Sequence, residues 1–133
     1  MRILLAGGYG QLGCALQTVL LPEHEVVAVD IPSLDITRID DVRLTLRQHQ
    51  PELVINCAAY TQVDAAETDA QAAYTVNALG ARNLAIASLE LGVALMQIST
   101  DYVFDGQTQT PYHEYCTPNP QSVYGLSKWA PIA

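Results

Sequence analysis

At 133 residues the chain has the length of one domain, and half of its residues are hydrophobic, which predicts a folded core rather than a disordered segment. Lys and Arg number 6 against 14 Asp and Glu, so the formal net charge is −8. This balance argues against a nucleic acid or an anionic membrane as a partner, because binding to either requires a basic surface. Backbone N–H groups and a helix end would have to hold any phosphate group instead.

The chain begins directly with a strand-like apolar run, without the layout of a signal peptide. No apolar stretch approaches the roughly 20 residues that a membrane span needs, and we therefore expect a cytoplasmic protein. The three cysteines, Cys14, Cys57 and Cys116, lack metal-ligand and C-x-x-C spacing, so neither a metal site nor a disulfide framework is expected.

Four apolar runs rich in Val, Ile and Leu predict buried strands at residues 3–6, 25–29, 53–57 and 94–99. The segments between them carry apolar residues at helical spacing: Leu12, Leu16, Val19 and Leu20 in the first; Ile39, Val42 and Leu46 in the second; Val76, Leu79, Leu84, Ala87 and Leu91 in the third.

Local signals predict where some of these elements begin and end. Thr37 and Asp40 resemble a capping box that opens the second helix, and Gly92 is expected to end the third. Residues 105–123 form a long loop, which in a compact domain is often functional.

Alternating strands and helices predict an α/β fold: a Rossmann-like doubly wound parallel sheet with right-handed crossovers. We expect the strand order 3-2-1-4, which leaves residues 94–99 at an edge. Because Leu95, Met96 and Ile98 make this edge apolar, we expect the isolated chain to self-associate or to be marginally stable.

Glycines follow the first predicted strand with the spacing G-x-x-G-x-x-G, at Gly7, Gly10 and Gly13. A dinucleotide site needs a tight turn, a bare backbone that a pyrophosphate can approach, and a helix N-terminus that supplies donors. A turn that merely joins strand to helix is the alternative. The position between the first strand and an amphipathic helix, with a second strand that ends in Asp30, favours dinucleotide binding.

Asp30 follows the second predicted strand, where a carboxylate can accept hydrogen bonds from the adenosine ribose. The alternative is a turn cap, because Pro32 and Ser33 follow. None of the cations lies in the glycine turn or directly after Asp30, so a 2′-phosphate would meet a carboxylate there. We therefore expect NADH to be favoured over NADPH. The cations are Arg2, Arg38, Arg43, Arg47, Arg82 and Lys128.

A tyrosine and a lysine are spaced to share one helical face, at Tyr124 and Lys128. In carbonyl reduction such a tyrosine donates a proton to the developing alkoxide, and the lysine assists it and can bind the nicotinamide ribose. Thr100, at the end of the fourth strand, offers a hydroxyl that can hold the carbonyl oxygen. Alone the spacing is weak evidence and also fits an ordinary surface helix. Together with the glycine turn and Asp30 it becomes specific.

Five stretches resemble the dTDP-4-dehydrorhamnose reductase family of the extended short-chain dehydrogenases/reductases. They read G-x-x-G-Q-L-G (7–13), L-D-I-T (34–37), N-C-A-A-Y-T-x-V-D (56–64), S-T-D-Y-V-F-D-G (99–106) and N-P-x-x-V-Y-G-x-S-K (119–128). The resemblance implies reduction of dTDP-6-deoxy-L-lyxo-4-hexulose to dTDP-L-rhamnose with NADH or NADPH, in the biosynthesis of cell-surface polysaccharide.

The resemblance also implies roles for individual residues. The catalytic set would be Thr100, Tyr124 and Lys128. The cofactor would be bound by Gly7, Gly10, Gln11, Leu12, Asp30, Asp35, Ile36, Ala58, Ala59, Tyr60, Tyr124 and Lys128. The dTDP-sugar would be bound by Thr100, Asp101, Tyr102 and Val103.

Several of these residues have simpler interpretations. Asp35 would otherwise cap the helix that follows it. Tyr60 and Tyr102 would otherwise pack at the rim of the domain. Asn77 and Gly80 lie one turn apart on the third predicted helix and could face the cofactor, although packing of the helix against the sheet is the simpler reason for Gly80.

The family continues for about as many residues again, with further strands and a substrate domain. Residues 1–133 are thus expected to be a partial NAD(P)-binding Rossmann domain, inactive by itself. Pro131 falls where the family continues a helix, and it is expected to end that helix. Two alternatives remain: a nucleotide-sugar epimerase or dehydratase of the same superfamily, or a non-catalytic NAD(P)-binding regulatory subunit, since that of methionine adenosyltransferase resembles this family.

Overall fold

A computed structural model of the chain describes residues 1–131. Four parallel strands form its sheet: β1 (Arg2–Ala6), β2 (Glu25–Val29), β3 (Leu53–Asn56) and β4 (Ala94–Gln97). The Rossmann-like α/β class is confirmed. The third and fourth strands are shorter than expected and end before Cys57 and Ile98, whose N–H groups make the last bonds to the neighbouring strands.

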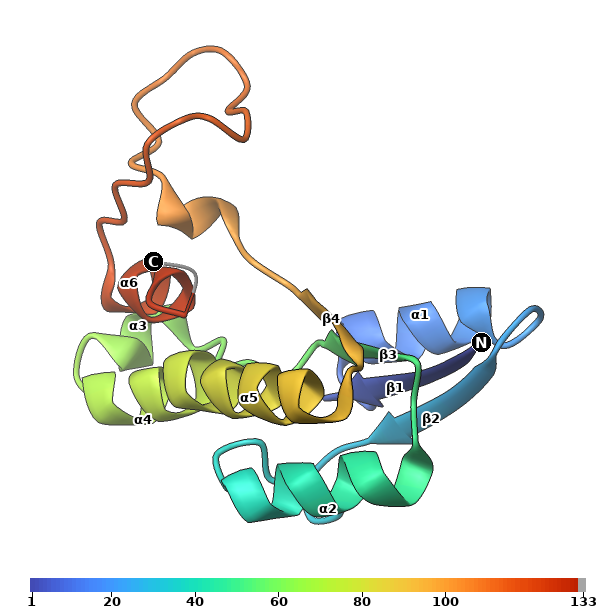
Figure 1. The fold of residues 1–133 in the computed structure, drawn as a ribbon. Coiled ribbons are helices and arrows are strands. Elements are labelled where there is room, and N and C mark those ends of the chain that lie inside the picture. Colours follow the sequence, from blue (N-terminus) through green and yellow to red (C-terminus); the bar gives the residue numbers. More distant parts are fainter. Residues whose placement is uncertain (132–133) are drawn as a thin grey trace.

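Three principal helical segments cover the sheet (Figure 1). They are α1 (Gln11–Leu20), α2 (Ile39–His49) and a long segment made of α4 (Ala70–Tyr74), a π-helical stretch (Thr75–Gly80) and α5 (Ala81–Leu91). The shorter elements are α3 (Val63–Ala66), a 3₁₀ turn (Asp101–Val103) and α6 (Val123–Trp129). As expected, Gly92 ends α5 in the left-handed conformation, with φ of 67°. No helix within residues 1–131 is both long and apolar enough to cross a membrane.

The strand order is β2-β1-β3-β4, so the predicted order 3-2-1-4 is wrong. The connection through α2 returns past β1, and β3 pairs with the free side of β1 in the register Ile3–Leu53 to Ala6–Asn56. The two interior strands, β1 and β3, are almost fully buried, whereas β2 is half exposed, as an edge strand is. β4 still lies at an edge, with Met96 50% exposed.

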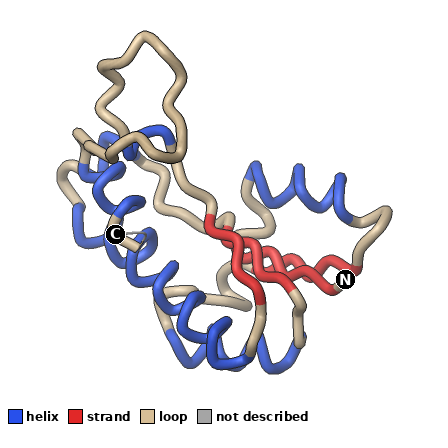
Figure 2. The backbone as a smooth tube through the Cα atoms, turned by 45° about the horizontal axis from the view of Figure 1, so that its top comes forward, coloured by secondary structure: helices blue, strands red, loops and turns tan. Residues whose placement is uncertain are grey.

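The two faces of the sheet are covered unequally. Figures 1 and 2 show α1 alone on one face and α2 with α5 on the other. Connections that leave β1 and β3 in opposite directions pass over opposite faces when crossovers are right-handed, so these two strands mark the switch point of the sheet. In such sheets the crevice beyond the carboxyl ends of the strands is where ligands bind.

The larger core lies under α2 and α5, where Leu4, Val42, Leu46 and Leu84 are buried. On the α1 side, Leu16 and Leu20 pack on Ile3, Leu5 and Ile55.

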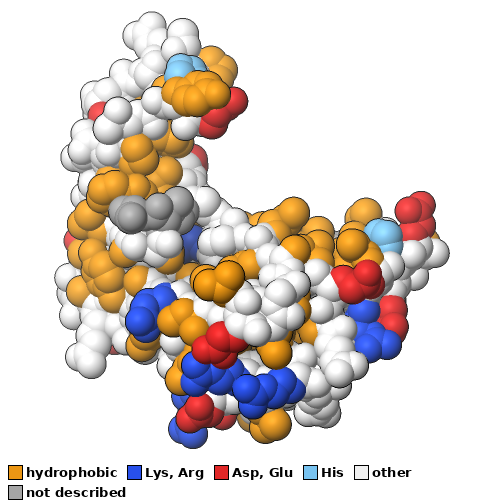
Figure 3. All heavy atoms as spheres, viewed as in Figure 1, with side chains coloured by type: hydrophobic (Ala, Val, Ile, Leu, Met, Phe, Trp, Pro, Cys, Tyr) orange, Lys and Arg blue, Asp and Glu red, His pale blue; other side chains and the backbone are white. Residues whose placement is uncertain are grey.

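The predicted apolar face of α1 is partly wrong. Val19 is 72% exposed, because it lies about 100° around the helix from Leu20 and therefore faces away from the sheet. Leu12 is 41% exposed at the first turn. On the third predicted helix, Leu79 and Leu91 are also partly exposed, at 41% and 39%. Hydrophobic side chains are visible on the surface beside α1 (Figure 3).

The predicted capping box before α2 is also wrong. Arg38 is the N-cap of α2 and makes no side-chain cap bond. The Thr37 hydroxyl instead donates to Asp35 Oδ1 at 2.7 Å, so it belongs to the preceding turn. By contrast, α6 ends at Trp129, as expected from Pro131, whose ring nitrogen has no N–H to continue the helix.

Candidate active site

A cleft of about 660 Å³ opens at the carboxyl ends of β1 and β3. The molecular surface is hollowed between the part that carries α6 and the part that carries α1 (Figure 3). The volume suits a cofactor-sized ligand. The residues to which the family resemblance assigned cofactor binding all line this cleft: Gly7, Gly10, Gln11, Leu12, Asp30, Asp35, Ile36, Ala58, Ala59, Tyr60, Tyr124 and Lys128.

The glycines of the first turn divide into two kinds. A Cβ on Gly7, whose φ is +71°, would lie 2.5 Å from the backbone N of Ala58, and a Cβ on Gly13 would collide with the carbonyl of Gly8. These two glycines are required by the fold. A Cβ on Gly10 would meet nothing closer than the Gly7 carbonyl at 3.4 Å, so the fold leaves this position open toward the cleft.

The N-terminus of α1 faces the cleft through Gln11 and Leu12. Its N-cap, Gly10, supplies no side-chain cap, and its first turn holds no acidic residue. A helix start without a side-chain cap offers N–H donors and the positive end of its dipole to an anion. The chain's own geometry therefore fits a pyrophosphate group.

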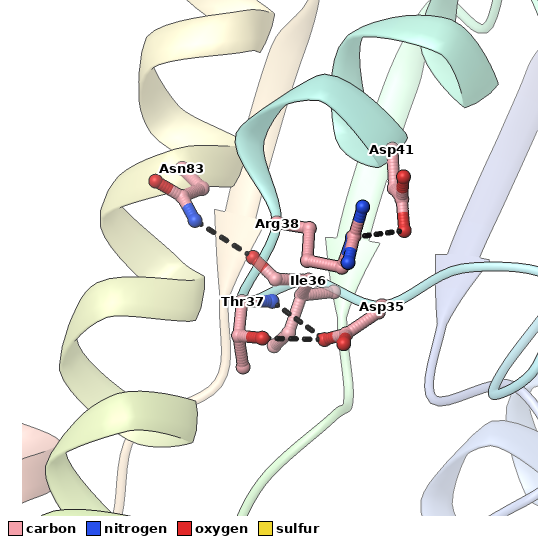
Figure 4. A network of polar contacts seen from close by, with 6 residues as sticks. All are labelled: Asp35, Ile36, Thr37, Arg38, Asp41 and Asn83. Carbon is pink, nitrogen blue, oxygen red and sulfur yellow. Dashed lines mark hydrogen bonds and ion pairs between the residues drawn. The ribbon is translucent and has the colours of Figure 1, made fainter.

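Two carboxylates mark one end of the cleft. Asp30 Oδ1 accepts from the N–H of Ile31 at 2.9 Å, and Asp35 Oδ1 accepts from both the N–H and the hydroxyl of Thr37 (Figure 4). Asp35 thus shapes its own turn and does not cap α2. Arg38, the nearest cation along the chain, pairs instead with Asp41 at 3.1 Å.

The turn that carries Asp35 is also held from α5. Buried Asn83 donates to the carbonyl of Ile36 at 3.0 Å, as Figure 4 shows. A Cβ on Gly80 would lie 2.6 Å from Ile36 Cδ1, so Gly80 allows the helix to approach this loop. Gly80 thus serves close packing, but the expected helix–sheet contact is wrong: its neighbour is Ile36 in the loop before α2, not a strand. Asn83 was not among the predicted site residues, although an asparagine on the apolar face of a helix is a usable signal for a buried polar contact.

The segment after β3 is fixed by Asn77, which is 2% exposed. Its Oδ1 accepts from the N–H of Tyr60 at 2.9 Å, and its Nδ2 donates to the carbonyl of Tyr60 and to Ser127 Oγ. Asn77 does not line the cleft. It lies in the π-helical stretch and binds the loop and α6 together instead of facing a ligand.

Helix α6 carries Tyr124 and Lys128 at the other end of the cleft. Ser122 Oγ accepts from the N–H of Gly125, and Glu67 Oε1 accepts from the N–H of Val123. Two N–H groups in the first turn of α6 are therefore held by side chains. Figure 1 shows α6 lying beside α3 and α4. The spacing therefore places both side chains on the cleft, as the sequence predicted.

Lys128 is 3% exposed and donates to the carbonyl of Ile98 at 2.7 Å. Burial lowers its pKa below the usual 10.5, and only the neighbouring Cys57 opposes this effect. Burial likewise raises the pKa of the Cys57 thiol, while the Lys128 charge acts to lower it. Among residues 1–131 no carboxylate pairs with this ammonium. Burying such a charge is costly for a fold, and costly buried charges are typical of functional positions.

The residues suggested for the sugar lie outside this cleft. Thr100 Oγ1 accepts from the N–H of Tyr102 and donates to Asp101 at 3.3 Å, all at exposed positions. Tyr102 packs edge-on against Tyr124, with ring centroids 5.4 Å apart, so the rim-packing interpretation describes part of its role. Val103 is only 7% exposed and faces the core, so a direct contact with a sugar is not built here.

The loop between residues 105 and 122 is organised around Asp105 and projects from the body of the molecule (Figure 2). The Asp105 carboxylate accepts from Tyr112 Oη, from the N–H of Gln107 and from Asn119 Nδ2. These bonds hold the pKa of Asp105 below its usual value. Phe104 stacks on Tyr112 with centroids 4.1 Å apart.

A Rossmann-like sheet, a helix N-terminus that opens on a dinucleotide-sized cleft and a buried lysine in that cleft define the class of protein: a Rossmann-like domain of the NAD(P)-binding type. Comparison with known proteins gives its family: residues 1–131 match the model described as RmlD substrate binding domain, and the chain belongs to that family. The chain is 43% identical to dTDP-4-dehydrorhamnose reductase of Aggregatibacter actinomycetemcomitans over 129 residues, which are 96% of this chain and 44% of that protein. The chain thus spans less than half the length of such relatives.

Solved structures agree with this assignment. The structure of dTDP-4-dehydrorhamnose reductase from Bacillus anthracis in complex with NADP gives a TM-score of 0.95 at 45% identity, over 98% of this chain and 47% of that one. UDP-glucose 4-epimerase from Thermus thermophilus in complex with NAD gives a TM-score of 0.88 at 27% identity, over 96% and 47%.

Proposed function

We propose that the chain binds NADH or NADPH in the cleft between Gly10 and Lys128 and belongs to a dTDP-4-dehydrorhamnose reductase. The observation that carries this proposal is the match between the cleft lining and the residues expected to bind the cofactor. Family membership and the NADP complex of the Bacillus anthracis relative support it.

The bound cofactor would supply the hydride that reduces the 4-keto group of dTDP-6-deoxy-L-lyxo-4-hexulose, giving dTDP-L-rhamnose. The N-terminus of α1 would hold the pyrophosphate, and Asp30 and Asp35 would bind the adenosine end. Lys128 would keep a positive charge at the reacting end, where it stabilises negative charge in a water-poor site.

Tyr124 would donate the proton to the oxygen of the reduced carbonyl. Thr100 would hold that oxygen by turning its hydroxyl from Asp101 toward the substrate. We place Asp101 and Tyr102 beside the sugar and assign Val103 an indirect part, through the backbone that it anchors in the core.

The test uses a protein that carries this chain together with the part that its relatives have beyond it. Tyr124→Phe should lower the reductase rate by about 10²–10⁴-fold while the affinity for NADH stays within about twofold. A Tyr124→Phe protein with full activity would exclude this tyrosine as the proton donor. Analysis of the product separates reduction from epimerisation or dehydration.

Three finer properties complete the proposal. NADH is preferred over NADPH, since Asp30 lines the cleft and the nearest cation along the chain is paired with Asp41. The protein works in the cytoplasm. The apolar β4 edge, with Met96 half exposed, favours association of copies of the isolated chain.

A further inference from the structure

A chain of side-chain amides runs from the loop after β3 to Lys128. Asn56 Oδ1 accepts from the N–H of Ala58 at 3.1 Å, and Asn56 Nδ2 donates to Gln97 Oε1 at 2.8 Å. Gln97 Nε2 then donates to the carbonyl of Ile98 at 3.0 Å, the same oxygen that accepts from Lys128 Nζ. Asn56 and Gln97 are adjacent partners in the β3–β4 register.

The Ile98 carbonyl needs such support because the sheet ends at this point. β4 stops at Gln97, and the bond from the N–H of Ile98 to the Asn56 carbonyl, at 3.4 Å, is the last along this strand pair. Beyond it, the Ile98 carbonyl accepts only from Gln97 and Lys128 among the described residues. Apart from Lys128, the Gln97 side chain is thus the one described group that holds this carbonyl by a hydrogen bond.

Lys128 depends on that oxygen in turn. An ammonium carries three N–H donors, and the described residues offer it one acceptor, Ile98 O. The remaining two donors are available to a ligand in the cleft that Lys128 lines. The orientation of the ammonium thus follows from the orientation of one peptide carbonyl.

We propose that Gln97 is a positioning residue: by fixing the Ile98 carbonyl, it holds the Lys128 ammonium at the reacting end of the cleft. Gln97 touches neither the cleft nor a ligand and acts through the peptide after it. The role of Lys128 in catalysis rests on the proposed function, whereas the tether itself does not.

The chain offers a clean measurement, because Lys128 is its only lysine. Labelling with [ε-¹³C]lysine gives one NMR signal, whose titration reports this ammonium alone, without nucleotide. Cys57 is the titratable group coupled to Lys128, so the titration is done in a Cys57→Ala background. A thermal melt of each variant confirms that it is folded.

Two substitutions at position 97 should shift the Lys128 pKa in opposite directions. Gln97→Met keeps the length but removes the tether, so the still-buried ammonium loses an oriented acceptor and its pKa should fall further. Gln97→Glu keeps the acceptor for Asn56 and places a carboxylate near the ammonium, so its pKa should rise. Gln62→Met, at an exposed position, is the matched control and should leave the titration unchanged.

A general loss of stability cannot produce shifts of opposite sign, since unfolding moves the pKa toward its ordinary value in both variants. Shifts in the same direction, or a Gln97→Met titration equal to that of the control, would overturn the proposal. Failure of the chain to bind NADH would count against the proposed function, but it would not affect the Lys128 pKa shifts expected for the two Gln97 variants.

Discussion

The Asn77 side chain binds both backbone polar groups of Tyr60: its Oδ1 accepts from the Tyr60 N–H at 2.9 Å, and its Nδ2 donates to the Tyr60 carbonyl at 3.1 Å. One side-chain amide thereby replaces the strand partner that the chain loses after β3. The same amide donates to Ser127 on α6, so the loop with Tyr60 and the helix with Lys128 share a single support.

Asn77→Ala should therefore destabilise the protein by about 1–3 kcal/mol, because the partly buried backbone groups of Tyr60 lose their side-chain partner and the buried Ser127 hydroxyl loses its donor. Urea unfolding followed by circular dichroism measures the change. Gln71→Ala, at an exposed position of α4, is the control and should stay within about 0.5 kcal/mol. Equal stability of the two variants would show that the Asn77 bonds contribute nothing net.

The glycines of the first turn should respond differently to alanine. Gly13→Ala should cost about 1–3 kcal/mol, because its Cβ would collide with the Gly8 carbonyl and the backbone would have to move. Gly10→Ala should cost less than about 1 kcal/mol, since nothing lies within 3.4 Å of its Cβ and only a preferred cap residue is lost. Thermal melts of both variants measure these two losses of stability. A larger loss for Gly10→Ala than for Gly13→Ala would contradict the conclusion that the fold requires Gly13 and leaves Gly10 open.

Asp30→Ala should narrow the preference for NADH over NADPH. In the wild type the carboxylate accepts from a ribose hydroxyl and repels a 2′-phosphate, so the variant should weaken NADH binding about tenfold and affect NADPH less. Fluorescence titration of both nucleotides gives the ratio. A wild type that binds NADPH more tightly would reverse our interpretation of Asp30.

The loop built on Asp105 should open in acid. Hydrogen bonds from Tyr112 and Asn119 hold the pKa of Asp105 below its usual 3.8 in the folded state. The stability that the ionised Asp105 carboxylate gives to the loop is therefore fully present above pH 3.8. It is lost as the pH falls through the lower pKa of the folded state. Hydrogen exchange across residues 105–122 should rise over this range.

At neutral pH, Asp105→Ala should produce the same faster exchange across residues 105–122. Glu114→Ala, in the same loop, should leave exchange unchanged and serves as the control. A loop that stays equally protected in Asp105→Ala would mean that the Phe104–Tyr112 stack organises it alone.

The sequence predicted those parts of the site that depend on local geometry. The glycine turn, Asp30 after a strand and the spacing of Tyr124 and Lys128 each follow from the position of a residue on one element, and the cleft brings these residues together. Buried strands were also recognisable, because strands covered on both faces are almost continuously apolar.

Contacts between distant elements were not predictable in this way. The partner of β1 was assigned wrongly, because apolar runs identify strands but not which side of β1 a returning chain takes. The side-chain amides of Asn77, Asn83 and Gln97 form hydrogen bonds with residues that lie more than 40 positions away in the sequence. No spacing rule predicts hydrogen bonds between residues so far apart.

Calorimetric titration of the chain with NADH, for the wild type and for Gly10→Val, tests the central claim most directly. A valine at this position should leave the chain folded, with a melting temperature only a few degrees lower because a preferred cap residue is lost. Its side chain would occupy the place where the pyrophosphate would approach α1. We predict saturable binding by the wild type and at least a hundredfold loss of affinity in the variant, equivalent to about 2.7 kcal/mol. Equal affinity in a folded Gly10→Val chain, or no binding by the wild type, would contradict the account.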